Sequence, residues 1–172
     1  MRHFAFIALL LCVLLTNTAC STIAEELPSY AKTSVVNIGD KAPNFAIESI
    51  DGQLLTMPNG ETTLLILFSH TCPDCRNMMS DLQTYLNNND AEGRIIAISR
   101  GGTHSEIASF RDELGITFAI AADEQAEIYY KYATMYVPRC YVIDGEGTIR
   151  HITYEYKIGD VDFLMEKLSN TK

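Results

Sequence analysis

The sequence predicts an α/β fold in which a central mixed β-sheet is flanked by helices. Short continuous apolar runs at 62–68 and 94–99 are typical of strands buried on both faces of a sheet. Segments with apolar residues at helical spacing separate these runs from a third strand-like run, ITFAIAAD. Such alternation of strands and helices is typical of parallel strands joined by helical crossovers.

The individual elements can be expected in chain order. Alternating residues on both sides of Asp51-Gly52 predict an early β-hairpin. Pro73 in a first turn and the apolar spacing behind it predict a helix over 73–86. Thr103 to Glu106 match a capping box for a helix that Gly115 ends. The remaining expected elements are a strand at 116–123, a short helix at 124–134, an antiparallel pair at 139–144 and 148–156, and a final helix at 160–168.

The N-terminal residues MRHFAFIALLLCVLLTNTAC follow the order of a secretory signal: one Arg, an apolar run, then small polar residues. Small residues before Cys20 resemble a bacterial lipoprotein signal, in which the cysteine becomes the lipidated first residue. Asn17 departs from that pattern, and ordinary cleavage or a short membrane anchor are the alternatives. We expect a signal peptide at 1–19, a polar tether at 20–34 and one domain at 35–172, in the periplasm or cell envelope.

The composition is that of a globular domain, with 47% hydrophobic and 20% charged residues and no Trp. The net charge of −9 argues against a nucleic-acid partner, because nucleic acids reward basic patches.

The main chemical motif is Cys72-Pro73-Asp74-Cys75, at the junction of a predicted strand and helix. Unpaired N–H groups and the helix dipole favour a thiolate at Cys72, which we expect to be the nucleophile. Cys75, one turn into the helix, is placed to attack a mixed disulfide and release the product. A zinc site is an alternative, but no second C-x-x-C is present. Two inert thiols are another, but exported thiols oxidise.

Three stretches together resemble the extracytoplasmic thioredoxin-like thiol–disulfide oxidoreductases of the alkyl hydroperoxide reductase/thiol-specific antioxidant (redoxin) superfamily. They are NIGDKAPNFAIESIDGQ, the C-x-x-C after an apolar strand, and VPRCYVIDGEG about sixty residues later. The resemblance covers roughly 36–168 and implies a thioredoxin-like fold with an added N-terminal β-hairpin. It implies a redox-active disulfide between Cys72 and Cys75, no cofactor and no metal. It also implies a cis bond before Pro138 and substrate binding by the backbone of Val137.

Departures from the family concern the surroundings of the cysteines. Thr71 stands where thioredoxins carry an aromatic residue. Ile66 and Met78 stand where thioredoxin and some maturation-type reductases carry acids, so the resemblance supplies no proton acceptor for Cys75. Cys140 is expected to be a buried strand residue, with a third active-site thiol as the alternative.

Pro73, Asp74 and His70 are expected to tune the pair. A carboxylate at Asp74 disfavours a neighbouring thiolate, so we expect a more reducing pair than one with Pro-His between the cysteines. His70 has two interpretations: it stabilises the thiolate or accepts a proton, or it is an exposed loop residue.

The expected function is that of a protein disulfide reductase with exported protein thiols and disulfides as partners. It would be reduced by a membrane or extracytoplasmic thiol donor and held at the membrane through a lipid on Cys20. A thiol peroxidase with antioxidant activity is an alternative, in which Ser69 would imitate the usual Thr, although no Pro precedes it on the loop. A metallochaperone that uses the cysteine pair and a His is another.

Overall fold

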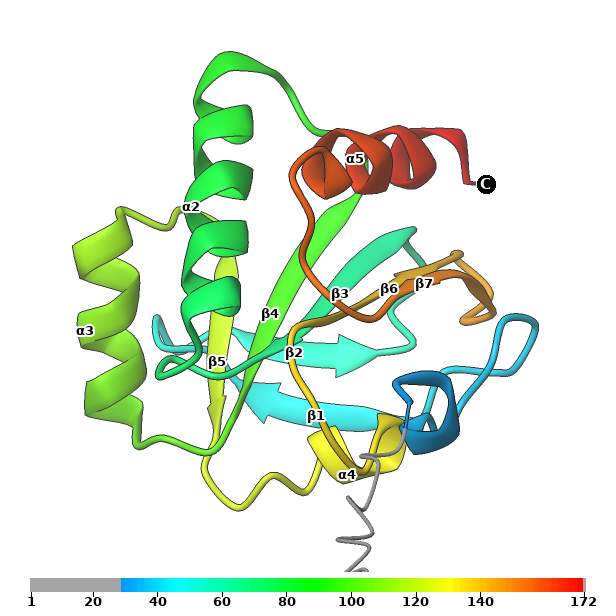
Figure 1. The fold of residues 1–172 in the computed structure, drawn as a ribbon, viewed down its shortest axis with the longest axis horizontal. Helices are drawn as coiled ribbons and strands as arrows, with labels where there is room; N and C mark the ends of the chain where they lie inside the picture. The colour runs from blue at the N-terminus through cyan, green and yellow to red at the C-terminus, as the bar shows by residue number, and fades with distance from the viewer. Residues whose placement is uncertain (1–28, 172) are drawn as a thin grey trace, which may run out of the picture.

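The computed structural model describes residues 29–171 (Figure 1). None of the helices in this part of the chain is long and apolar enough to cross a membrane. The elements in chain order are η1 (Ala31–Thr33), β1 (Phe45–Glu48), β2 (Leu54–Met57), β3 (Thr63–Phe68), α2 (Pro73–Asn88), β4 (Arg94–Arg100), α3 (His104–Leu114), β5 (Ala119–Asp123), α4 (Tyr129–Tyr132), β6 (Arg139–Ile143), β7 (Ile149–Thr153) and α5 (Asp160–Asn170).

The central sheet has five strands in the order β5-β4-β3-β6-β7. Strands β3, β4 and β5 are parallel, while β6 is antiparallel to both β3 and β7. The expected mixed sheet is therefore confirmed. The expected early hairpin is also present, as a separate two-stranded sheet of β1 and β2 (Figure 1).

Strand β3 lies at the centre of the sheet and is buried along its whole length. Its side chains alternate between two cores, as the two-residue period of a strand requires. Leu64, Ile66 and Phe68 face a core to which α2, α3 and α5 contribute. Leu65 and Leu67 face the second core, which the β1–β2 hairpin and α4 close. This layering fixes the end of β3, and with it the loop that carries Cys72.

Most expected elements form, with shifted ends. Helix α2 continues to Asn88, and β7 ends at Thr153 rather than 156. The helix expected over 124–134 is only the single turn α4. Its start is displaced because the Asp123 carboxylate accepts hydrogen bonds from the backbone N–H groups of Glu127, Ile128 and Tyr129, which holds the preceding residues in a turn.

The packed structure begins before Val35, where the sequence placed the start of the domain. Residues 29–34 were expected to belong to a tether, yet they form the turn η1, and Thr33 is buried. The Thr33 carbonyl accepts a hydrogen bond from the Thr134 backbone N–H, and Ser34 forms a β-bridge with Ala133. The expected signal peptide, Cys20 and the first part of the tether lie outside the described residues.

Candidate redox site

Cys72 is the N-cap residue of α2, and Pro73 occupies the first turn. The backbone N–H of Cys75 points at the Cys72 sulfur, with an N–Sγ distance of 3.5 Å. Cys72 is half-buried, whereas Cys75 is fully buried. The sequence therefore placed both cysteines correctly relative to the helix. Since the N-terminal N–H groups and the helix dipole favour negative charge, the accessible sulfur is the one at the anion-stabilising position.

The surroundings of Cys75 are apolar. Burial raises the pKa of the Cys75 thiol well above its ordinary value, and a hydrogen bond from the Ser69 backbone N–H, 3.4 Å from the sulfur, offsets this only in part. Met78 lies one turn further along α2 and is also buried. Met78 is not an acid, and the residue at the neighbouring position of β3, Ile66, is not an acid either. The Cys75 thiolate is thus costly to form.

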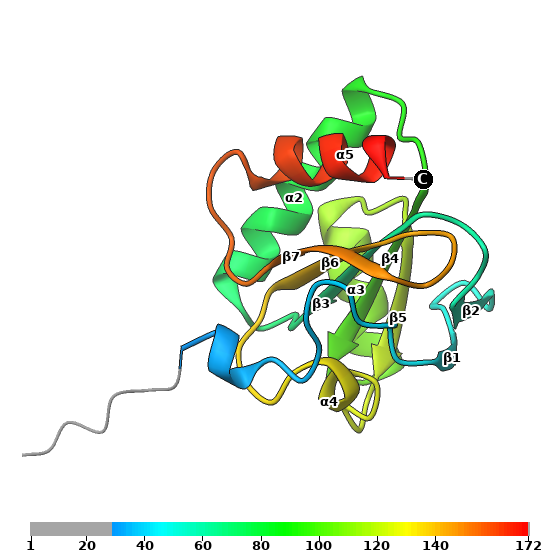
Figure 2. The same cartoon turned by 90° about the vertical axis from the view of Figure 1, so that its right-hand side faces the viewer.

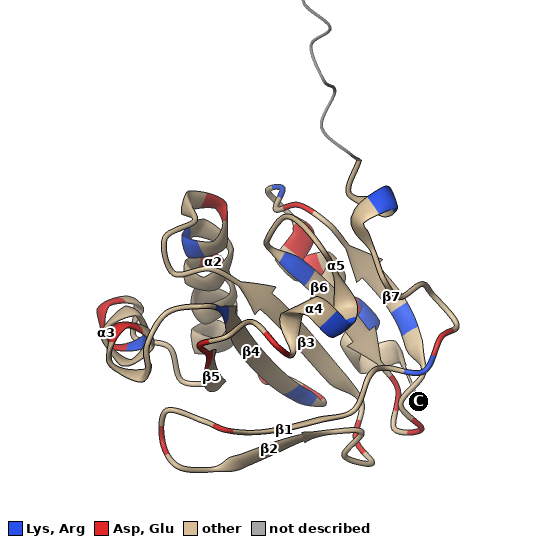
Figure 3. Cartoon of the chain, turned by 90° about the horizontal axis from the view of Figure 1, so that it is seen from below, with Lys and Arg blue, Asp and Glu red and all other residues tan. Residues whose placement is uncertain are grey.

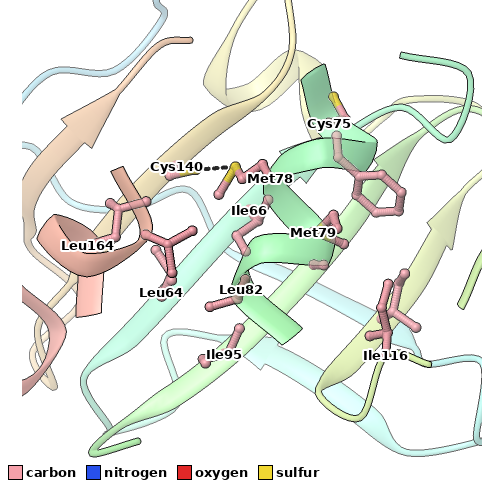
Figure 4. Close-up of a cluster of buried hydrophobic side chains, with 14 of the residues drawn as sticks. Leu64, Ile66, Cys75, Met78, Met79, Leu82, Ile95, Ile116, Cys140 and Leu164 are labelled. Atoms are coloured by element: carbon pink, nitrogen blue, oxygen red, sulfur yellow. Dashed lines mark hydrogen bonds between the residues drawn. The ribbon is translucent and has the colours of Figure 1, made fainter. Parts of the chain in front are cut away.

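Cys140 is buried, as expected, and its thiol donates to the Met78 sulfur at 3.6 Å (Figure 4). It lies on β6 directly opposite Ile66 of β3. Burial raises the pKa of Cys140 to about 12. Cys72, Cys75 and Cys140 are all free thiols in the described part of the chain, and Cys140 is packed in the same hydrophobic core as Cys75.

The Val137–Pro138 peptide bond is cis, as expected. The Cys72 sulfur lies 3.8 Å from the Val137 carbonyl oxygen, so the two expected substrate-contacting features meet. Tyr136, just before them, has a φ of 68°, a conformation that residues other than glycine rarely adopt. The Tyr129 hydroxyl donates to the Tyr136 carbonyl at 2.7 Å and holds this conformation. Strained backbone of this kind concentrates at functional sites.

Arg139 follows the cis proline and is fully buried, a position that was not expected from the sequence. Its guanidinium donates to the carbonyls of Met135 and Tyr30, at 2.8 and 3.1 Å, and to the Thr33 hydroxyl. It also lies 5.3 Å from the centre of the Tyr154 ring. Arg139 has no ion-pair partner among residues 29–171. The available signal was a single charged residue inside the otherwise uncharged run VPRCYVI.

The remaining candidate tuning residues lie on different sides of the site. Asp74 and Pro73 are exposed in the first turn of α2. The His70 ring packs against Gly102, where an added Cβ would come within 2.8 Å of its Nδ1. That nitrogen is buried and has no hydrogen-bond partner in the described part of the chain. The His70 ring is therefore packed against Gly102 rather than freely exposed on a loop.

A C-x-x-C motif shortly after a central strand, a helix capped by the first cysteine, and a facing cis proline define the class of thioredoxin-like proteins. The AhpC/TSA family matches residues 38–152, and the chain belongs to this family.

Relatives and solved structures agree with this assignment. The thiol–disulfide oxidoreductase ResA of Geobacillus thermodenitrificans is 24% identical over 126 residues, which cover 72% of each chain. The ResA of Oceanobacillus iheyensis is 26% identical over 125 residues, 69% of this chain and 65% of that protein. A Bacteroides thetaiotaomicron structure, assigned there as a protein disulfide isomerase, has a TM-score of 0.71 at 26% identity and covers 81% of this chain and 92% of its own. StoA of Bacillus subtilis shares the fold, with a TM-score of 0.63 at 18% identity over 73% of this chain and 96% of its own.

Proposed function

We propose that this protein is a thiol–disulfide oxidoreductase that reduces disulfides of exported proteins outside the cytoplasm. The observation that carries the proposal is the asymmetry of the cysteine pair: a half-buried Cys72 caps α2 beside Val137, and Cys75 is fully buried behind it. The relatives named thiol–disulfide oxidoreductases support the same chemistry.

The reaction takes two steps. The Cys72 thiolate attacks one sulfur of the substrate disulfide, forms a mixed disulfide and expels the other sulfur as a thiolate. The Cys75 thiol then loses its proton and attacks the Cys72 sulfur, which releases the second substrate thiolate. Two electrons pass from the protein to the substrate, and the protein is left with a Cys72–Cys75 disulfide. The backbone of Val137 would hold the substrate chain next to Cys72 during the first step.

The reducing direction follows from what the site does not stabilise. A strongly oxidising pair owes its potential to a stabilised reduced form. Here Asp74 places a carboxylate between the two cysteines in the first turn of α2, and burial disfavours the Cys75 thiolate. The reduced form therefore gains little stabilisation from ionisation of Cys75. The pair is therefore expected to give up electrons readily.

The location of the protein is part of the proposal. We place it outside the cytoplasm, attached to the membrane by a lipid on Cys20, with a membrane or extracytoplasmic thiol as electron donor. One structure of the same fold is of a secreted Mycobacterium tuberculosis disulfide oxidoreductase. Replacement of Cys20 by Ser should move the protein from the membrane fraction to the soluble fraction of the cell envelope. Because an uncleaved segment 1–19 would also hold the variant at the membrane, mass spectrometry of the wild-type N-terminus decides, and a chain without a lipid on Cys20 would contradict the anchor.

A redox titration of the purified protein in dithiothreitol and glutathione buffers tests the proposal, with alkylated thiols counted by mass spectrometry. We expect one two-electron transition confined to Cys72 and Cys75. Its potential should lie closer to the roughly −270 mV of thioredoxin than to the roughly −120 mV of a dedicated disulfide-forming enzyme. A potential near the second value would overturn the reducing direction.

Peroxide treatment separates the proposal from a thiol peroxidase. If Cys72 forms a sulfenic acid faster than it exchanges with disulfides, the peroxidase takes precedence. In the structure, the Ser69 backbone N–H donates a hydrogen bond to the Cys75 sulfur, and the Ser69 hydroxyl is hydrogen-bonded to the Thr71 hydroxyl at 3.0 Å.

Within residues 29–171, no group of three or more His, Cys, Asp or Glu side chains is arranged to hold a metal ion.

A further inference from the structure

A hollow of about 370 Å³ lies beside the candidate redox site. Its lining comes from the N-terminal turn and from the region between β7 and α5, and includes Tyr30, Tyr154 and Glu155. Figure 2 shows η1, the beginning of α2 and the β7–α5 loop on the same side of the molecule. None of these residues was expected from the sequence to have a role at the site.

A chain of short contacts links this hollow to Cys72. The Tyr30 ring lies 4.5 Å from the Tyr136 ring and 6.3 Å from the Tyr154 ring, measured between centroids. Tyr136 directly precedes Val137, whose carbonyl oxygen is 3.8 Å from the Cys72 sulfur. An extended substrate chain advances about 3.3 Å per residue. A side chain one or two residues from the substrate's cysteine is therefore within reach of the hollow.

The charges around the hollow are mainly acidic. Glu155 and Asp160 line it, and Asp74 is exposed at the start of α2. Figure 3 shows acidic positions at the start of α2 and in the β7–α5 loop, at the edge from which the N-terminal turn projects. The pKa of Tyr30 is raised, first by burial and then by Glu155, Asp74 and Cys72, against the opposing charge of Arg139. The electrostatic potential at this hydroxyl therefore has more acidic than basic sources.

Two basic residues near the hollow oppose the negative charge of its acidic side chains. Arg139 is fully buried, and three of its hydrogen bonds go to backbone carbonyls, so it lies beneath the hollow rather than in it. Lys157 also lines the hollow, with its ammonium 3.9 Å from the Glu155 carboxylate. Both members of this pair are exposed, and exposed pairs of this kind are weak. A basic side chain of a substrate can displace Lys157 from Glu155.

We propose that this hollow is a substrate subsite for a lysine or arginine side chain one or two residues from the reacting cysteine, an assignment that rests on the proposed disulfide exchange. The aliphatic stem would lie along the tyrosine rings, and the charged head would reach Glu155. Tyrosine rings bury such stems well, and the long basic side chains pair an apolar stem with a charged head. Tyr30 and Glu155 are thus specificity residues for the exchange reaction.

The test uses short alanine-based peptides whose single cysteine carries a thionitrobenzoate group through a disulfide. Four sets of peptides place arginine, norleucine or glutamate one or two residues before or after the cysteine. The Cys72 thiolate of the reduced protein attacks the peptide sulfur and expels the coloured thionitrobenzoate anion, so stopped-flow absorbance measures the first step alone. Each rate is divided by the rate of the same peptide with dithiothreitol, which removes differences in intrinsic reactivity.

We expect the arginine peptide to react about fivefold faster than the norleucine peptide, and the glutamate peptide to react more slowly than both. Glu155→Gln and Tyr30→Leu should each reduce the arginine preference to about twofold or less, and Lys157→Gln should increase it. Glu146→Gln, an exposed acid in the β6–β7 turn, is the matched control and should leave the preference unchanged. Added salt should also reduce the preference.

Equal normalised rates for the arginine, norleucine and glutamate peptides at all four positions would overturn the subsite and leave the proposed function standing. The subsite is also wrong if the arginine preference survives in both Glu155→Gln and Tyr30→Leu. If the wild-type protein releases thionitrobenzoate from none of the peptides, the proposed function itself is wrong, and the subsite falls with it.

Discussion

The two sides of Cys72 are surrounded by different kinds of residues. On the inner side lies Cys75, in a core of apolar side chains with Met78 and Cys140 beneath it. On the outer side lies Val137, between a tyrosine with unusual backbone geometry and a buried arginine that holds the N-terminal turn. The inner side offers backbone hydrogen bonds to the two sulfurs, whereas the outer side offers aromatic rings and charges.

This difference assigns separate tasks to the two sides. The inner side makes the Cys75 thiolate costly, and so it governs how quickly a mixed disulfide is resolved and how that step depends on pH. The outer side surrounds the place where a substrate chain would lie, and so it governs which substrates react. Substitutions on each side can test this division of tasks, beginning with the largest expected effect.

The division requires that only Cys72 attack the substrate. Cys72→Ser should reduce disulfide exchange to the background rate, because the accessible nucleophile is gone. Cys75→Ser should still form the mixed disulfide but fail to resolve it, so that the protein–substrate adduct accumulates. Mass spectrometry of acid-quenched reactions distinguishes the two results. An adduct that accumulates on Cys75 in the Cys72→Ser variant would contradict the assigned roles.

On the outer side, Arg139 is expected to be the main structural support. Arg139→Met leaves the Met135 carbonyl without its side-chain donor and removes one hydrogen bond each from the Tyr30 carbonyl and the Thr33 hydroxyl. Buried acceptors without partners are costly, so the free energy of unfolding should fall by about 2 to 3 kcal/mol in urea titrations. The N-terminal turn should also become susceptible to proteases.

Arg76→Met is the matched control for Arg139→Met. The Arg76 guanidinium pairs with Glu113 at 2.8 Å, but Glu113 is largely exposed and Arg76 is only half-buried. Its replacement should lower the free energy of unfolding by less than about 1 kcal/mol. Equal losses in the two variants would show that the buried network around Arg139 is not a special support.

On the inner side, the pH dependence of resolution is the signature. Burial raises the pKa of Cys75, so its thiolate is a small fraction that grows as the pH rises. Collapse of the mixed disulfide should therefore accelerate about tenfold per pH unit from neutral to mildly alkaline pH. Rapid-quench measurements across this range test the slope, and a plateau near neutral pH would contradict it.

Met78→Glu sharpens the same point by adding the missing proton acceptor one turn from Cys75. A buried carboxyl group has a pKa raised toward neutrality, which suits a general base. Resolution at pH 7 should accelerate about tenfold or more, and its pH dependence should flatten. Met78→Leu keeps the apolar volume without an acid, and this control should retain the steep slope.

The inner side could be predicted from the sequence because its determinants are local. Cys72 and Cys75 are three residues apart at a strand–helix junction, and Cys140 stands in an apolar run close to Pro138. A short motif and a hydrophobic pattern are sufficient to place all of these residues.

The outer side could not be predicted because its determinants are distant in the chain. Arg139 meets Tyr30 and Thr33 more than one hundred residues away. Residues 29–34 carry no periodic pattern, so their composition indicated a tether. They pack through individual contacts with a buried arginine and with the backbone near α4. Hydrophobic periodicity in a sequence does not predict contacts of that kind.

The smallest expected effect belongs to Cys140, which would join the two tasks if it were a third redox thiol. It lies 3.6 Å from the Met78 sulfur, is fully buried, and has its pKa raised to about 12 by that burial. Cys140→Ala should therefore act as a small core deletion and lower the free energy of unfolding by about 1 kcal/mol. The redox potential and the resolution rate should stay at their wild-type values, because the Cys140 thiol is fully buried against the Met78 sulfur, where a substrate disulfide does not reach it. A tenfold change in resolution rate, measured with the same rapid-quench assay, would instead place Cys140 in the electron path and make the inner side a three-thiol centre.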